Sequence, residues 1–341
     1  MESHPELERR LWLFSRRADF WIACGGASAA ILAAVALILF RGDRELDAID
    51  FVLSEFHLGV TYDAVLRRRL WHHRPLDVLA IPLAILALTY IISLGGHGVL
   101  LTSIAMYAAV WHRGRQNLGI ARFYQRQVGG PVSRMHDVLF RGAVYLPMLA
   151  AALAYTHIAP REYEGAPYLA LNLGAEPTAI VGIAAVLCVG AYLAWLFLRQ
   201  FIGAGLPKLM IHPGEWWIVL AHAVAFGSSY ALGASNASFL LVLAVHHEVQ
   251  YLYFAYAMAR RPASFPPATR IEKLRPTPLR SKWRADLKHA AAFLTWPVLG
   301  FAGALAGGWL QLTWLVPLGV GGLFCHYWLD ARIWTRRAFQ N

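Results

Sequence analysis

The stretch FWIACGGASAAILAAVALILF, residues 20–40, decides the fold class because it contains no charged side chain. A transmembrane α-helix needs about 17–25 mainly apolar residues, so this run is long enough for one crossing. The basic segment ERRLWLFSRR precedes it, as it would in a secretory signal peptide. The apolar part is longer than that of a signal peptide, however, and a clear small-x-small cleavage site is missing. We therefore interpret residues 20–40 as a retained transmembrane helix.

Runs of the same kind recur along the whole chain of 341 residues. Hydrophobic residues make up 58% of the sequence and charged residues only 15%, which is not the composition of a soluble protein. The sequence therefore predicts an all-α, polytopic membrane helical bundle that forms a single transmembrane domain over residues 1–341. The expected spans are ten in number, at 19–40, 46–66, 77–95, 98–118, 136–158, 178–200, 214–233, 238–259, 288–307 and 310–332.

The charges of the loops predict the orientation of these spans. Basic residues collect before the first span and after the second, fourth, sixth, eighth and tenth, whereas segments 42–50 and 161–178 are acidic or neutral. Cytoplasmic loops are enriched in Lys and Arg, so both termini are expected in the cytoplasm, as in a multi-pass protein of a bacterial-type inner membrane. Segment 262–284 is expected to be a basic, Pro-rich cytoplasmic loop within reach of anionic membrane lipids. These loops explain the net charge of +11, and no nucleic-acid-binding motif accompanies it.

A second stretch, LVLAVHHEVQYLYFAYAMARR at residues 241–261, places polar groups in the middle of an expected span. Ionisable side chains inside a membrane are costly and usually functional. With a rise of ~1.5 Å per residue, the histidines of spans two, seven, eight and ten lie ~9–20 Å from the cytoplasmic helix ends. A shared polar site in the cytoplasmic half of the bundle would gather them. Ionisable residues within the other spans include Glu55, His57, Asp63, His112, Glu215, His222, His326 and Asp330.

Most of these histidines are followed four residues later, on the same helix face, by a hydrogen-bonding side chain. A metal-bound imidazole usually needs such a partner for its second ring nitrogen. We therefore predict a metal site with the ligands His57, His112, His222, His246, His247 and His326. The predicted catalytic side chains are Glu248 and Asp330, as carboxylate ligands or bases, and Tyr251, as a hydrogen-bond or proton donor. The remaining histidines fall at span ends or in loops and are expected to be interfacial or solvated: His72, His73, His97, His136, His157, His212 and His289.

The types of the candidate ligands restrict the metal. Imidazole and carboxylate ligands without a thiolate suit iron, zinc, copper or manganese. The zinc-protease motif HExxH is incomplete here, because HEVQY at residues 247–251 lacks the second histidine. Non-haem iron that activates O₂, as one ion or as a pair, best fits a histidine site that is reachable from lipid. Zinc, copper and haem fit such a site less well.

The distribution of His57, His112, His246, His247 and His326 over several spans resembles that of the histidine-rich integral-membrane non-haem iron enzymes. This group includes membrane desaturases and hydroxylases and membrane enzymes that cleave carotenoids. The resemblance implies O₂-dependent chemistry on a lipid-like substrate. The resemblance lies in the distribution of histidines over several spans. It does not extend to shared motifs, because the HxxxH and HxxHH boxes of the desaturases are absent from this sequence.

We therefore expect a metal-dependent oxidoreductase, an oxygenase, hydroxylase or desaturase, that acts on a hydrophobic substrate with O₂ and an electron donor. Two other functions are compatible with the same residues. One is a haem or quinone redox protein of the membrane, which a haem absorption band would reveal. The other is a proton-coupled transporter that uses an intramembrane relay of histidines and carboxylates.

Overall fold

We analysed a computed structural model of the full chain. It describes residues 12–23, 44–67, 70–128, 133–158, 162–163, 166–199, 211–233, 239–260 and 316–333, together with isolated positions at 35–36, 38–39 and 298. The predicted loop 262–284 and the predicted span 288–307 therefore lie outside the described residues, apart from position 298.

The described chain is mostly helical and contains one short antiparallel pairing of β1 (Glu162–Tyr163) with β2 (Ala166–Pro167). The chain divides into two compact units, one with residues 1–51 and 92–251 and the other with residues 52–91 and 252–341. Its short helical segments are α2 (Arg16–Ala18), α5 (Leu70–His73) and the π-helices η1 (Asp19–Ala23) and η2 (Leu76–Ala80). The longer helices are α4 (Arg44–Arg67), α6 (Ile81–Leu94), α7 (Gly98–Gln127), α8 (Arg134–Ile158), α9 (Ala175–Phe197), α10 (Pro213–Gly233), α11 (Phe239–Arg260) and α13 (Val316–Ile333).

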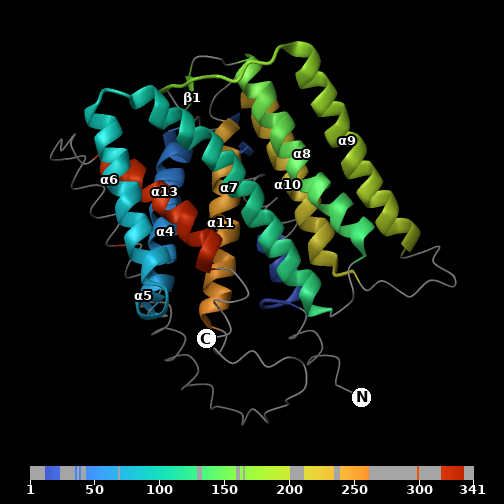
Figure 1. The fold of residues 1–341 in the computed structure, drawn as a ribbon. Helices are drawn as coiled ribbons and strands as arrows, with labels where there is room; N and C mark the ends of the chain where they lie inside the picture. Colours follow the sequence, from blue (N-terminus) through green and yellow to red (C-terminus); the bar gives the residue numbers. More distant parts are fainter. Residues whose placement is uncertain are drawn as a thin grey trace, which may run out of the picture. The chain divides into compact units, whose positions relative to one another are not determined.

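In the first unit, helix α8 packs against both α9 and α10, and α7 packs against α8 and α10 (Figure 1). Large side chains fill the spaces between these helices, among them Tyr124, Tyr192, Phe226 and Tyr230, each at most 1% exposed. Ser133 directly precedes α8, and its hydroxyl accepts a hydrogen bond from the His136 N–H at 3.2 Å and so caps the helix.

In the second unit, α13 is joined to α4 and to η2 by hydrogen bonds and by a small apolar core. The Tyr62 hydroxyl donates to the Gly322 carbonyl oxygen at 2.9 Å, and the Trp328 indole N–H donates to the Asp77 carbonyl oxygen at 2.9 Å. Val65 of α4 and Leu329 of α13 lie in one buried cluster with residues of α5 and η2. These contacts fix the register in which α4 and α13 present their polar side chains to each other.

Three helical stretches of the described residues are long and apolar enough to cross a membrane: Leu76–Leu94, Arg134–His157 and Ala175–Phe197. Helix α9 exposes Ile180, Ile183, Val186 and Leu187, each by at least 59% of its surface. A helix that exposes so much apolar surface suits a lipid environment rather than water. The helical fold class is confirmed, and the apolar helices are consistent with a membrane protein.

Eight of the ten predicted spans coincide with described helices, namely α4, the joined η2 and α6, α7, α8, α9, α10, α11 and α13. The largest difference in length concerns α7, which continues to Gln127 although the sequence predicts its end near residue 118. Its charged last third keeps an internal face on which Leu118, Ile120, Ala121 and Tyr124 are buried. Helical periodicity therefore persists where the average polarity of the segment rises.

The close approach of α8 to α9 gives a first testable prediction. A Cβ atom at Gly142 of α8 would overlap the Cys188 sulfur of α9, whereas a Cβ at Gly190 of α9 would meet no atom within 4 Å. We expect Gly142→Ala to lower the free energy of unfolding by about 1–3 kcal/mol through overpacking. The matched change Gly190→Ala should instead raise it by about 0.5–1 kcal/mol through helix propensity. Denaturant unfolding in detergent would measure both, and a Gly142→Ala protein as stable as Gly190→Ala would contradict the packing of α8 on α9.

Candidate metal centre

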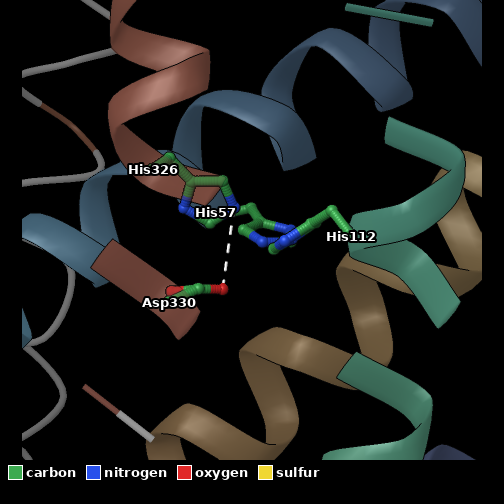
Figure 2. Close-up of side chains that lie close together, drawn as sticks. All are labelled: His57, His112, His326 and Asp330. Carbon is green, nitrogen blue, oxygen red and sulfur yellow. Dashed lines mark ion pairs between the residues drawn. The ribbon is translucent and has the colours of Figure 1, made fainter. Parts of the chain in front are cut away.

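A group of buried polar side chains lies between α4 and α13 in the second unit. His57 and Thr61 are one turn apart on α4. His326 and Asp330 are one turn apart on α13, and Figure 2 shows both with His57. The four side chains are 4%, 0%, 1% and 7% exposed, respectively. Spacing of four residues places both members of each pair on one helix face, so the two facing helices bring four polar groups together.

Thr61 connects the two residues of α13. Its hydroxyl donates a hydrogen bond to Asp330 Oδ1 at 2.8 Å, and its oxygen also lies 2.8 Å from His326 Nδ1. A threonine hydroxyl has one proton to donate, and here that proton is used for Asp330. His326 Nδ1 is therefore the donor in the second bond, which leaves the lone pair of the neutral ring on Nε2. The sequence places Thr61 four residues after His57, but its partners are on the other helix.

The potential ligand atoms of this group converge. His326 Nε2 lies 3.7 Å from Asp330 Oδ2, the pair marked by a dashed line in Figure 2. One ligand atom from each of His57, His326 and Asp330 lies within 4.8 Å of the others. The rings of His57 and His326 meet edge-on, with centroids 4.5 Å apart and planes at 83°. This spacing suits three ligands of a single ion, because each metal–ligand bond would be about 2.0–2.2 Å long.

The other predicted site residues lie in the first unit. His112 of α7 and His247 of α11 meet edge-on, with ring centroids 5.2 Å apart. The Gln116 side-chain amide donates to the His247 carbonyl oxygen at 3.2 Å and so links α7 to α11. His246, Glu248 and Tyr251 of α11 are also buried. Their predicted roles as metal ligands or catalytic groups stay predictions.

His222 makes a contact between helices. Its Nε2 donates to the Val144 carbonyl oxygen of α8 at 2.9 Å, and the side chain is fully buried. His222 therefore holds α10 to α8 through one ring nitrogen. Metal binding by His222 stays a prediction. The ligand atom would have to be Nδ1, because Nε2 donates to the Val144 carbonyl oxygen.

For two of the seven histidines that were expected to be interfacial or solvated, the expectation is wrong. His136 is 1% exposed and His212 is not exposed. His136 Nε2 lies 2.7 Å from Glu215 Oε1, and the His212 ring stacks on Tyr124 with centroids 5.0 Å apart. Closeness to a helix end suggested solvent, but helix packing buries these ends. A signal was available for His136, because Phe140 and Ala143 follow it at helical spacing and are also buried.

Another buried carboxylate, Asp19, lies in the N-terminal segment of the first unit and was missed by the sequence analysis. It accepts hydrogen bonds from the backbone N–H groups of Leu13 and Phe14 and, at 2.9 Å, from the Tyr124 hydroxyl. Asp19 precedes an apolar run in the sequence. An acidic residue at such a position usually indicates the solvated start of a helix. In the structure, the hydrogen bonds of Asp19 instead hold the preceding segment against Tyr124 of α7.

Comparison of the chain with protein-family models, with curated proteins and with solved structures gives no match.

Proposed function

We propose that this chain is a multi-pass membrane enzyme that uses non-haem iron to oxidise a lipid-like or other hydrophobic substrate with O₂. In this proposal ten spans cross the membrane and both termini lie in the cytoplasm. An electron donor supplies the reducing equivalents. The proposed iron ligands in the second unit are His57, His326 and Asp330.

The observation that supports this proposal is the composition of the ligand group. Two imidazoles and one carboxylate are the ligand set of non-haem Fe(II) oxygenases, in which the remaining coordination positions stay open. No cysteine belongs to the group, which disfavours sites built on thiolates. The donor set therefore fits iron, and bound iron would supply the activation of O₂.

The surrounding residues prepare the ligands for this task. Thr61 holds His326 in the tautomer that exposes its Nε2 lone pair, and it also occupies one oxygen of Asp330. Asp330 Oδ2 stays directed toward His326 Nε2. Burial of all three ligands in a low-dielectric region strengthens the attraction between a cation and the carboxylate. It also keeps bulk water away from reactive species.

Iron-dependent consumption of O₂ would test the function. Protein freed of metal by a chelator would be supplied with Fe(II) or Zn(II), together with ascorbate and a total lipid extract from bacterial membranes. We expect O₂ uptake only with Fe(II), accompanied by a lipid product that has gained oxygen or lost hydrogen. Equal O₂ uptake by the parent protein and by His57→Ala would contradict the proposal. A Soret band in the purified protein would favour the haem alternative instead.

Thr61 gives a second prediction. We expect Thr61→Val to lower iron affinity about 10–100-fold, because loss of an outer partner of metal ligands typically has this effect. Valine keeps the shape of threonine but can neither accept from His326 Nδ1 nor donate to Asp330 Oδ1. Thr61→Ser keeps the hydroxyl and should bind iron nearly as the parent does. Competition with a chelator of known affinity would measure both variants, and equal affinities for valine and serine would argue against the assigned tautomer.

A further inference from the structure

The first unit contains a recess formed by α8 together with its neighbours α9 and α10 (Figure 1). The volume of this recess is about 380 Å³, within the range of about 300–1,000 Å³ that is usual for ligand sites. Small and apolar residues form most of its wall, and none of the described residues that line it is charged. The Thr178 hydroxyl, one of two hydroxyl groups in the wall, donates to the Gly174 carbonyl oxygen at 2.7 Å. The recess is therefore suited to an apolar occupant.

The recess has a buried floor and an exposed rim. Ala151 of α8 and Ala185 of α9 belong to the floor and are only 6% and 5% exposed. Val186 of α9 belongs to the rim and is 73% exposed. The rim continues into the exposed apolar face of α9 that includes Ile183 and Leu187. An occupant can therefore enter sideways, from the medium that surrounds α9.

Close contacts between helices explain where the recess begins. His222 of α10 donates to the Val144 carbonyl oxygen of α8 at 2.9 Å. At a similar level of α8, Gly142 approaches Cys188 of α9 so closely that a Cβ atom would overlap the sulfur. On α8 the recess begins beyond these contacts, at Pro147, where the helix lacks one backbone N–H donor and where helices commonly kink. The three helices are thus held together at one level, and the small residues beyond it leave space between them.

The length of the recess matches one leaflet of a bilayer. It follows α9 from Thr178 to Val189, a rise of about 16 Å at ~1.5 Å per residue. The hydrocarbon core of a bilayer is about 30 Å thick, so one leaflet contributes about 15 Å. Thr178 lies in the first turn of α9, and Tyr155 and Tyr168 stack near the corresponding end of α8, with ring centroids 6.4 Å apart. Tyrosine is enriched at membrane–water interfaces, so this end of the recess suits the interface and the opposite end suits the bilayer centre.

We propose that this recess binds one acyl chain of a membrane phospholipid. The chain lies along α9, with its ester end near Thr178 and its methyl end near Pro147 and Val189. An acyl chain fits because the wall offers no charged partner to a polar ligand, and because the rim opens onto the apolar face of α9. The inference rests on the proposed placement of α8 and α9 across a membrane, but it does not involve iron.

Photolabelling of the full chain in vesicles of dioleoylphosphatidylcholine tests this proposal. One probe phospholipid carries a diazirine near the ester of an acyl chain, and a second probe carries it near the methyl end. Mass spectrometry of peptides identifies the labelled residues. We expect the first probe to label Ala154 and Thr178, and the second to label Pro147 and Ala185. Labels confined to the exposed face of α9, or the same labels from both probes, would overturn the proposal.

Two glycines of α9 provide matched variants. A Cβ atom at either Gly182 or Gly190 would meet no atom within 4 Å, but only Gly182 lines the recess. Gly182→Leu fills the recess, so it should abolish the labelling of Pro147 by the second probe. Gly190→Leu should retain this labelling, and equal labelling of Pro147 in the two variants would refute the site.

The labelling of Leu187, on the exposed face of α9, separates the possible failures. Loss of the Pro147 label with retention of the Leu187 label in Gly182→Leu supports the recess as a lipid site. Absence of the Leu187 label from every protein would contradict the membrane placement on which the inference rests. The labelling requires neither iron nor O₂, so its result is independent of whether the metal centre oxidises a substrate.

Discussion

Replacing His326 with alanine is expected to remove iron from the protein. His326 supplies the Nε2 lone pair of the proposed centre, and its loss also breaks the link through Thr61 that orients the ligands. The decrease in affinity should exceed the ~10–100-fold loss that is typical when only an outer partner of a ligand is removed. Iron retained after dialysis against a weak chelator, measured by elemental analysis, would report the change.

The matched control for this experiment is His72→Ala, which removes an exposed histidine of α5. It should retain as much iron as the parent protein. Helical content measured by circular dichroism would ensure that the His326→Ala protein is folded when its iron is counted. A folded His326→Ala protein with the iron content of the parent would exclude His326 as a ligand.

Replacing Glu215 with alanine is expected to cause the largest loss of stability among the substitutions considered. Alanine would leave His136 and the Tyr192 hydroxyl buried without the carboxylate that both of them contact. Leaving a buried polar group without its partner typically costs about 1–3 kcal/mol, and this substitution affects two such groups. Denaturant unfolding in detergent would measure the difference in the free energy of unfolding.

Glu176→Ala provides the comparison, because Glu176 also lies in the first turn of a helix but is exposed. Substitutions of exposed residues away from special features usually change stability by less than about 0.5 kcal/mol. Losses of similar size for Glu215→Ala and Glu176→Ala would show that the contacts between His136, Glu215 and Tyr192 contribute little to the fold.

The helical fold class could be predicted from the sequence because long apolar runs in this chain can fold only with their backbone hydrogen bonds satisfied internally. That constraint makes helices the expected outcome wherever such a run is long enough. Length and polarity define helix ends less well, as α7 illustrates. Its segment after residue 118 is polar on average but still buries Leu118 and Tyr124 on one face.

The candidate site could be predicted only in part. Helical spacing correctly placed His326 and Asp330 on one face, and the polar side chains singled out on α4 and α13 are buried and lie together. Their role in metal binding stays a prediction. The link through Thr61 could not be predicted, because it depends on which faces of two helices meet far apart in the sequence. His136 was misplaced for a related reason, since its burial results from packing against α9 and α10 rather than from its own position near a helix end.

Elemental analysis combined with an absorption spectrum of the unmodified protein, purified in detergent, tests the central claim most directly. We expect about one iron ion per chain, held by the single group of His57, His326 and Asp330, and no Soret band. A protein that shows O₂-dependent oxidation of lipid while it contains no metal, or a Soret band in place of non-haem iron, would contradict it.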